Sequence, residues 1–194
     1  MERKYYVLTG LALGLGLIGG SLVPSLTTNP AKKDLDDIVV SIPFNTTDIG
    51  VNEIPDAPLY SESQVPANYC SRYVRFAARD LYDIEYPADD AWKLRNHSNM
   101  NAIKLNSGDD LRELADNETL KPGMVVGMFY PASKYNGRQD VEKAGYTHVL
   151  LYLGSKDGEL YFADKFGSKI RKSSLSKLQS ENGLVPKEIL HKKN

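Results

Sequence analysis

The sequence is poor in cysteine and histidine. It holds one Cys, Cys70, and three His among 194 residues, so no intrachain disulfide can form. The histidines lie far apart in the sequence and have no second cysteine beside them, which leaves no credible set of zinc ligands. We therefore expect no metal and no other cofactor, and the lone thiol becomes the residue whose reactivity needs explaining.

An excess of charge of one sign is also absent. Lys and Arg total 24, Asp and Glu total 25, and the formal net charge is -1. Proteins that hold nucleic acid use basic patches to neutralise phosphates, and no long basic stripe occurs here, so nucleic acid is not an expected partner. With 41% apolar residues the chain falls among ordinary globular proteins. We expect one folded domain that acts as a monomer.

The N-terminus holds a long apolar run. Residues 1–23 contain two basic residues, Arg3 and Lys4, followed by mostly apolar residues until Pro24 breaks the run. This layout is typical of a secretory signal peptide, and its length also suits an uncleaved membrane anchor. The sequence leaves both alternatives open. Either one predicts that the protein is secreted or membrane-anchored, with its remainder outside the cytoplasm.

The rest of the chain divides into a spacer and a domain. Residues 24–58 are rich in Pro, Ser, Thr, Asn and Asp, which predicts a flexible spacer with at most a short strand at 38–40. Residues 59–194 are expected to form the domain, beginning with a helix over 70–82 for which Asn68 is the expected N-cap. The apolar stripe of this helix follows helical spacing at Cys70, Val74, Ala77, Ala78 and Leu81.

Beyond this helix the pattern becomes that of strands. A second helix is expected at 109–115, and segment 131–145 is expected to be a long connection that shapes substrate access. Apolar runs bounded by turn residues predict strands at 124–130, 146–153, 159–164 and 168–171. A helix followed by an antiparallel sheet of about 4–6 strands indicates an α+β domain with the helix packed on the sheet.

Cys70 stands at the start of the expected helix. Unpaired backbone N–H groups and the helix dipole favour a thiolate there, and the thiolate is the nucleophilic form of cysteine. The N–H groups of Cys70 and Ser71 are candidates for holding the oxyanion that forms when a carbonyl is attacked. The side-chain amide of Asn68 is a further candidate for this role.

A nucleophilic thiol needs a base, and His148 is the best-placed histidine. It lies inside an apolar strand, where a polar imidazole needs a partner. His97 lies in a polar stretch and His191 in a basic tail, so both are expected to be solvated. Asp164 is the candidate for orienting the imidazole.

The position of Asp164 depends on the hairpin turn. A three-residue turn at 156–158 places Asp164 one diagonal step from His148 on the same sheet face. A two-residue turn at Asp157 and Gly158 sends it to the opposite face. The sequence leaves both registers open.

Four segments together resemble the motif series of the CHAP-type and NlpC-type cysteine peptidases. They are Asn68–Val74, Asp89–Trp92, Lys121–Val126 and Thr147–Gly154. The resemblance implies a papain-like α+β fold, cleavage of amide or peptide bonds in peptidoglycan, and a catalytic pair of Cys70 and His148. It also makes Trp92 a substrate-binding candidate and a cell-wall peptide or glycopeptide the expected partner.

Two of the motifs depart from the family pattern. Met124 follows Gly123 where the families have Asp, and the stretch Tyr69–Arg72 stands where they have Asp-Cys-Ser-Gly. These changes are expected to affect substrate choice more than chemistry. Two other functions stay open: a non-catalytic cell-wall-binding module of the same fold, and a thiol acyltransferase or lipid amidase at a membrane surface.

Overall fold

The computed structural model describes residues 53–193. The expected signal peptide or anchor at 1–23, most of the spacer and the strand at 38–40 lie outside the described residues. Within residues 53–193, no helix is both long and apolar enough to cross a bilayer. Ile54 and Ala57, at the end of the expected spacer, pack against the apolar core.

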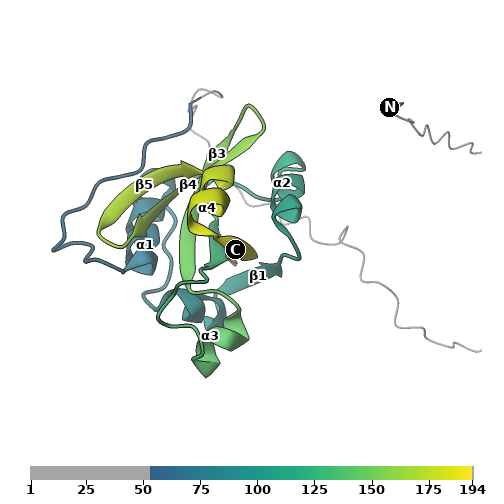
Figure 1. The fold of residues 1–194 in the computed structure, drawn as a ribbon. Coiled ribbons are helices and arrows are strands. Elements are labelled where there is room, and N and C mark those ends of the chain that lie inside the picture. Colours follow the sequence, from purple (N-terminus) through teal and green to yellow (C-terminus); the bar gives the residue numbers. More distant parts are fainter. Residues whose placement is uncertain (1–52, 194) are drawn as a thin grey trace, which may run out of the picture. The chain divides into compact units, whose positions relative to one another are not determined.

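One open sheet organises the described part of the chain (Figure 1). Its strands are β1 (Met100–Lys104), β2 (Val125–Phe129), β3 (His148–Lys156), β4 (Glu159–Phe166), β5 (Lys169–Ser174) and β6 (Val185–Lys192). They follow the order β1-β6-β2-β3-β4-β5, and every neighbouring pair is antiparallel. The α+β class and the antiparallel sheet predicted from the sequence are confirmed.

Five helical segments complete the described fold. They are α1 (Cys70–Tyr82), the 3-10 helix η2 (Ala91–Asn96), α2 (Gly108–Asp116), α3 (Gln139–Ala144) and α4 (Leu175–Asn182). The predicted helix over 70–82 is confirmed. The N-cap prediction is wrong, because Tyr69 occupies that position and no side chain caps the helix. Asn68 instead has a positive φ of 64° and donates its backbone N–H to the carbonyl oxygen of Gly167.

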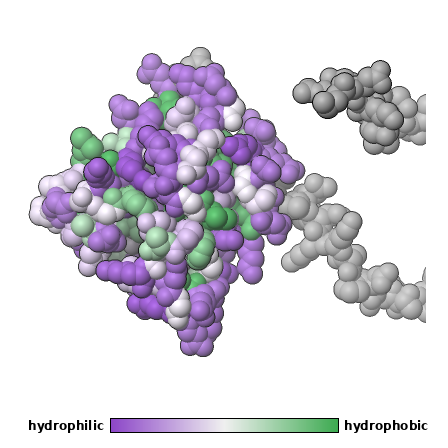
Figure 2. Space-filling model, in the orientation of Figure 1, coloured by the Kyte–Doolittle hydropathy of each residue, from purple (hydrophilic) through white to green (hydrophobic). Residues whose placement is uncertain are grey.

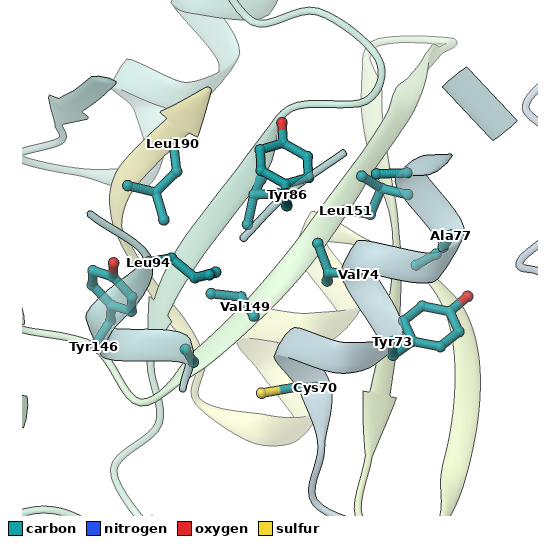
Figure 3. Close-up of a cluster of buried hydrophobic side chains, with 14 of the residues drawn as sticks. Cys70, Tyr73, Val74, Ala77, Tyr86, Leu94, Tyr146, Val149, Leu151 and Leu190 are labelled. Atoms are coloured by element: carbon teal, nitrogen blue, oxygen red, sulfur yellow. The ribbon is translucent and has the colours of Figure 1, made fainter. Parts of the chain in front are cut away.

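Apolar clusters cover both faces of the sheet. Val149 and Leu151 of β3 belong to the cluster that includes α1, whereas Leu150 and Tyr152 belong to the cluster that includes α2 and α4. Alternate side chains of β3 therefore enter different clusters, which explains its continuous apolar sequence. Figure 3 shows the α1 cluster, with Cys70 at its margin.

The surface is mostly polar. Figure 2 shows hydrophilic residues over most of one face, with apolar residues in small scattered groups. Among the described residues, the large hydrophobic side chains that are exposed are Leu59, Tyr69 and Val185. One sequence expectation about exposure is wrong: His191 is buried, because the expected basic tail forms β6 between β1 and β2.

Candidate active site

Cys70 is the first residue of α1, and the residue is only 8% exposed. Because no side chain caps the helix, the backbone N–H groups of its first turn keep their hydrogen-bonding capacity toward a ligand. The helix dipole adds positive potential at the same end. The local structure therefore favours a negative charge on the sulfur.

His148 and Asp164 come from adjacent strands and form a buried pair. The distance between His148 Nε2 and Asp164 Oδ2 is 2.7 Å, and the residues are 6% and 1% exposed. His148 also acts on Cys70, because the charges of the two groups lower the pKa of the thiol and raise that of the imidazole. Since Nε2 faces Asp164, Nδ1 is the ring nitrogen left for the thiol. The structure thus brings together the three residues that the sequence singled out.

The register between β3 and β4 explains how Asp164 reaches His148. Lys156 pairs with Glu159, so the turn has two residues, which by itself would send Asp164 to the wrong face. A β-bulge between Tyr152 and Gly154 inserts one extra residue into β3 and shifts the register by one. Leu151 then pairs with Ala163, the register that a three-residue turn would give. The bulge therefore restores the face predicted for Asp164.

The three groups shift one another's protonation. Burial alone would raise the pKa of the Cys70 thiol, but charge attraction and a hydrogen bond from His148, with one from the Val149 backbone, hold that pKa below its ordinary value. Burial alone would lower the pKa of His148, yet the Cys70 charge and the bond to Asp164 raise it. Both directions favour the thiolate–imidazolium form of the pair over the neutral form.

Arg171 of β5 is a residue of the site that the sequence reasoning missed. Its Nε lies 2.9 Å from Asp164 Oδ1 and its Nη2 lies 2.6 Å from Asp164 Oδ2. Burial alone would raise the pKa of Asp164, but hydrogen bonds from His148 and Arg171 hold it below its usual range. In the thiolate–imidazolium form, charges alternate in sign along Cys70, His148, Asp164 and Arg171, and the four together are neutral.

The position of Arg171 is itself fixed by several contacts. Asp164 and Arg171 are direct cross-strand partners, and Arg171 Nη1 donates to Asn182 Oδ1 at 2.8 Å. The guanidinium lies 4.2 Å from the ring centre of Phe166, whose edge-on contact with His148 spans 5.4 Å. A two-residue turn at 167–168 predicts the pairing of Asp164 with Arg171, and this was the signal available in the sequence.

The other predicted site residues have separate surroundings. Ser71 is half-buried and lines a pocket on the flank of α1. Trp92 is buried in the same cluster as Cys70, and its Nε1 donates to Asp140 at 2.9 Å, so the indole N–H is already bonded. His97, expected to be solvated, is half-buried and lies 3.1 Å from Asp89.

No protein-family model, curated protein or solved structure matches this chain. The resemblance to CHAP-type and NlpC-type peptidases therefore stays a prediction. Within residues 53–193, no group of three or more His, Cys, Asp and Glu side chains is arranged to hold a metal ion.

Proposed function

We propose that this protein is a cysteine hydrolase of papain-like fold that cleaves an amide or peptide bond in a cell-wall-like peptide. The observation that carries the proposal is the buried linkage of Cys70, His148 and Asp164 from one helix and two strands. A thiol at a helix start beside a histidine oriented by a carboxylate is the arrangement that nucleophilic catalysis requires. The motif resemblance supports peptidoglycan as the substrate.

The reaction begins with the thiolate of Cys70. Its sulfur attacks the carbonyl carbon, and the N–H groups of Cys70 and Ser71 hold the resulting oxyanion. The imidazolium of His148 then donates its proton to the leaving amine as the carbon–nitrogen bond breaks. This step leaves a thioester on Cys70 and a neutral imidazole.

Water completes the cycle. Neutral His148 removes a proton from a water molecule, whose oxygen attacks the thioester carbonyl. The carbon–sulfur bond breaks, the acid product leaves, and the thiolate and imidazolium return. Throughout, Asp164 accepts the Nε2–H hydrogen bond and keeps Nδ1 directed at the sulfur.

The proposed location is outside the cytoplasm, either secreted or held at a membrane by residues 1–23. A thiol acyltransferase or lipid amidase would use the same three side chains. Analysis of products formed with water and with added amines separates hydrolysis from transfer. A wall-binding module has no need of the reactive pair, and an unreactive Cys70 thiol would favour it.

Replacing Cys70 with Ser in the full chain tests the proposal. The protein is incubated with purified peptidoglycan, and mass spectrometry detects the fragments released. We expect Cys70→Ser to abolish release while circular dichroism and thermal unfolding stay nearly unchanged. The control His191→Gln removes a histidine of β6 and should retain release. Release by the Cys70→Ser protein would overturn the assignment of the nucleophile.

A further inference from the structure

A pocket of about 270 Å³ lies beside the start of α1. Its walls are Tyr69, Ser71, Arg72 and Arg75 on one side and residues 87–90 on the other. Tyr69 and Ser71 are the chain neighbours of Cys70, which is not itself part of the pocket wall, so the pocket lies one residue along the chain from the nucleophile. Tyr69, Arg72 and Arg75 recur every three residues and share one flank of the helix start.

The acidic residues of this pocket already have partners. Asp90 lies 2.8 Å from Lys93 Nζ, and Asp89 lies 3.1 Å from His97 Nε2 and 3.8 Å from the same lysine. The two carboxylates therefore share one lysine, and His97 adds a hydrogen bond to Asp89.

The two arginines of this pocket differ from its acidic residues in their contacts. Among residues 53–193, no carboxylate lies within 4.0 Å of either Arg72 or Arg75. The Arg72 guanidinium lies 5.6 Å from the Tyr69 ring centre, and that of Arg75 lies 5.2 Å from the Phe76 ring centre. Arg72, Arg75 and Lys93 together face two carboxylates, so the pocket keeps a net positive charge, and the donors of the two arginines are available to a ligand.

We propose that this pocket binds a carboxylate of the substrate, so that the enzyme selects amide bonds close to an acidic group. The inference rests on the proposed function and adds its substrate class. Guanidinium groups match carboxylates in charge and in the geometry of two parallel hydrogen bonds. A neutral substrate leaves this match unused. Arg72 replaces a glycine of the family motifs, so the preference belongs to this chain's own sequence.

Two alkylating reagents of equal length test the proposal on the full chain. N-iodoacetylglycine carries a carboxylate, and N-iodoacetylglycinamide carries a neutral amide in its place. In both reactions the Cys70 sulfur bonds to the methylene carbon and iodide leaves. Rates are divided by those of N-acetylcysteine with the same reagent, which removes intrinsic differences in reactivity. We expect the anionic reagent to react about five-fold faster, as a partly exposed ion pair allows.

Charge variants locate the source of that preference. The double variant Arg72→Gln, Arg75→Gln should bring the rate ratio to about one. Arg79→Gln, which removes an exposed arginine of the same helix paired with Asp80, should keep the preference. Equal rates with both reagents, or a preference that survives the double variant, would overturn the pocket assignment and leave the reactive thiol intact.

A second measurement covers the case of an unreactive thiol. If Cys70 reacts no faster than N-acetylcysteine with either reagent, the proposed function fails. The pocket is then tested by titrating N-acetylglycine into the Cys70→Ser protein and following binding by NMR. Binding that disappears in the double arginine variant supports the carboxylate site, and absence of binding overturns it.

Discussion

Replacing Asp164 with Asn removes one buried charge while nearly preserving side-chain shape. Asp164 is 1% exposed, and its carboxylate accepts one hydrogen bond from His148 and two from Arg171. Removing one partner of a buried ion pair costs about 3–5 kcal/mol. We expect about 3 kcal/mol, the lower end, because the Arg171 side chain is 19% exposed and keeps its bond to Asn182.

The same substitution should make the Cys70 thiol less acidic. Two effects oppose each other, because the Asp164 charge directly raises the pKa of Cys70, whereas the His148 charge that it stabilises lowers it. The direct effect of Asp164 is the smallest contribution to the pKa of Cys70, and that of His148 is larger. The pKa of Cys70 should therefore rise in Asp164→Asn.

Urea unfolding and iodoacetamide alkylation across a pH series measure the two effects. Asp157→Asn is a matched control, because Asp157 lies in the exposed β3–β4 turn and its positive φ of 54° suits Asn. The control should lie within about 0.5 kcal/mol of the parent protein. An Asp164→Asn protein with parental stability and parental alkylation midpoint would refute the electrostatic reasoning.

Two further substitutions test contacts in the sheet that supports the site. Arg171→Gln should raise the pKa of Asp164. In the parent protein the low pKa of Asp164 stabilises the fold above about pH 4, and this stabilisation is lost as the pH falls. Urea unfolding from pH 3 to 7 should then show lower stability at neutral pH and a smaller loss of stability toward pH 3 than in the parent or in the control Lys169→Gln, which changes an exposed lysine of β5; a parental pH dependence would contradict this role. Gly127→Ala should lower stability by about 1–3 kcal/mol, because a Cβ there would lie 2.9 Å from ring atoms of buried Tyr146. Thermal unfolding measures this, and an unchanged midpoint would show that the ring moves aside without cost.

Local patterns predicted much of the fold. The helix over 70–82 follows from its apolar stripe, and strands near 124–130, 146–153, 159–164 and 168–171 follow from apolar runs between turns. The segment at 131–145 was expected to be a connection and contains α3. These elements are determined mainly by residues close together in the sequence, which is why sequence reasoning found them.

Two of the missed strands depend on contacts between distant segments. Strands β1 and β6 pair with each other across most of the domain, and β6 mixes Lys, Glu and His with apolar residues, so its sequence resembles a polar tail. His191 was wrongly expected to be solvated for the same reason. Tertiary pairing fixes the two strands and the burial of His191. The bulge near Leu153 does have a local signal that the sequence reasoning missed, because Gly154 is a glycine inside an apolar strand and adopts a φ of 137°.

The most direct test of the account is the pH dependence of Cys70 alkylation by iodoacetamide in the full chain. Because the lowered pKa of Cys70 depends on His148, the midpoint should lie below the ordinary thiol value of about 8.5 and move upward in His148→Gln. Hydrolysis of substrate should continue above the midpoint of alkylation. It should then decline at still higher pH, where His148 loses its proton near its raised pKa of about 10. An alkylation midpoint at or above 8.5 in the parent protein, unchanged by His148→Gln, would contradict the thiolate–imidazolium pair.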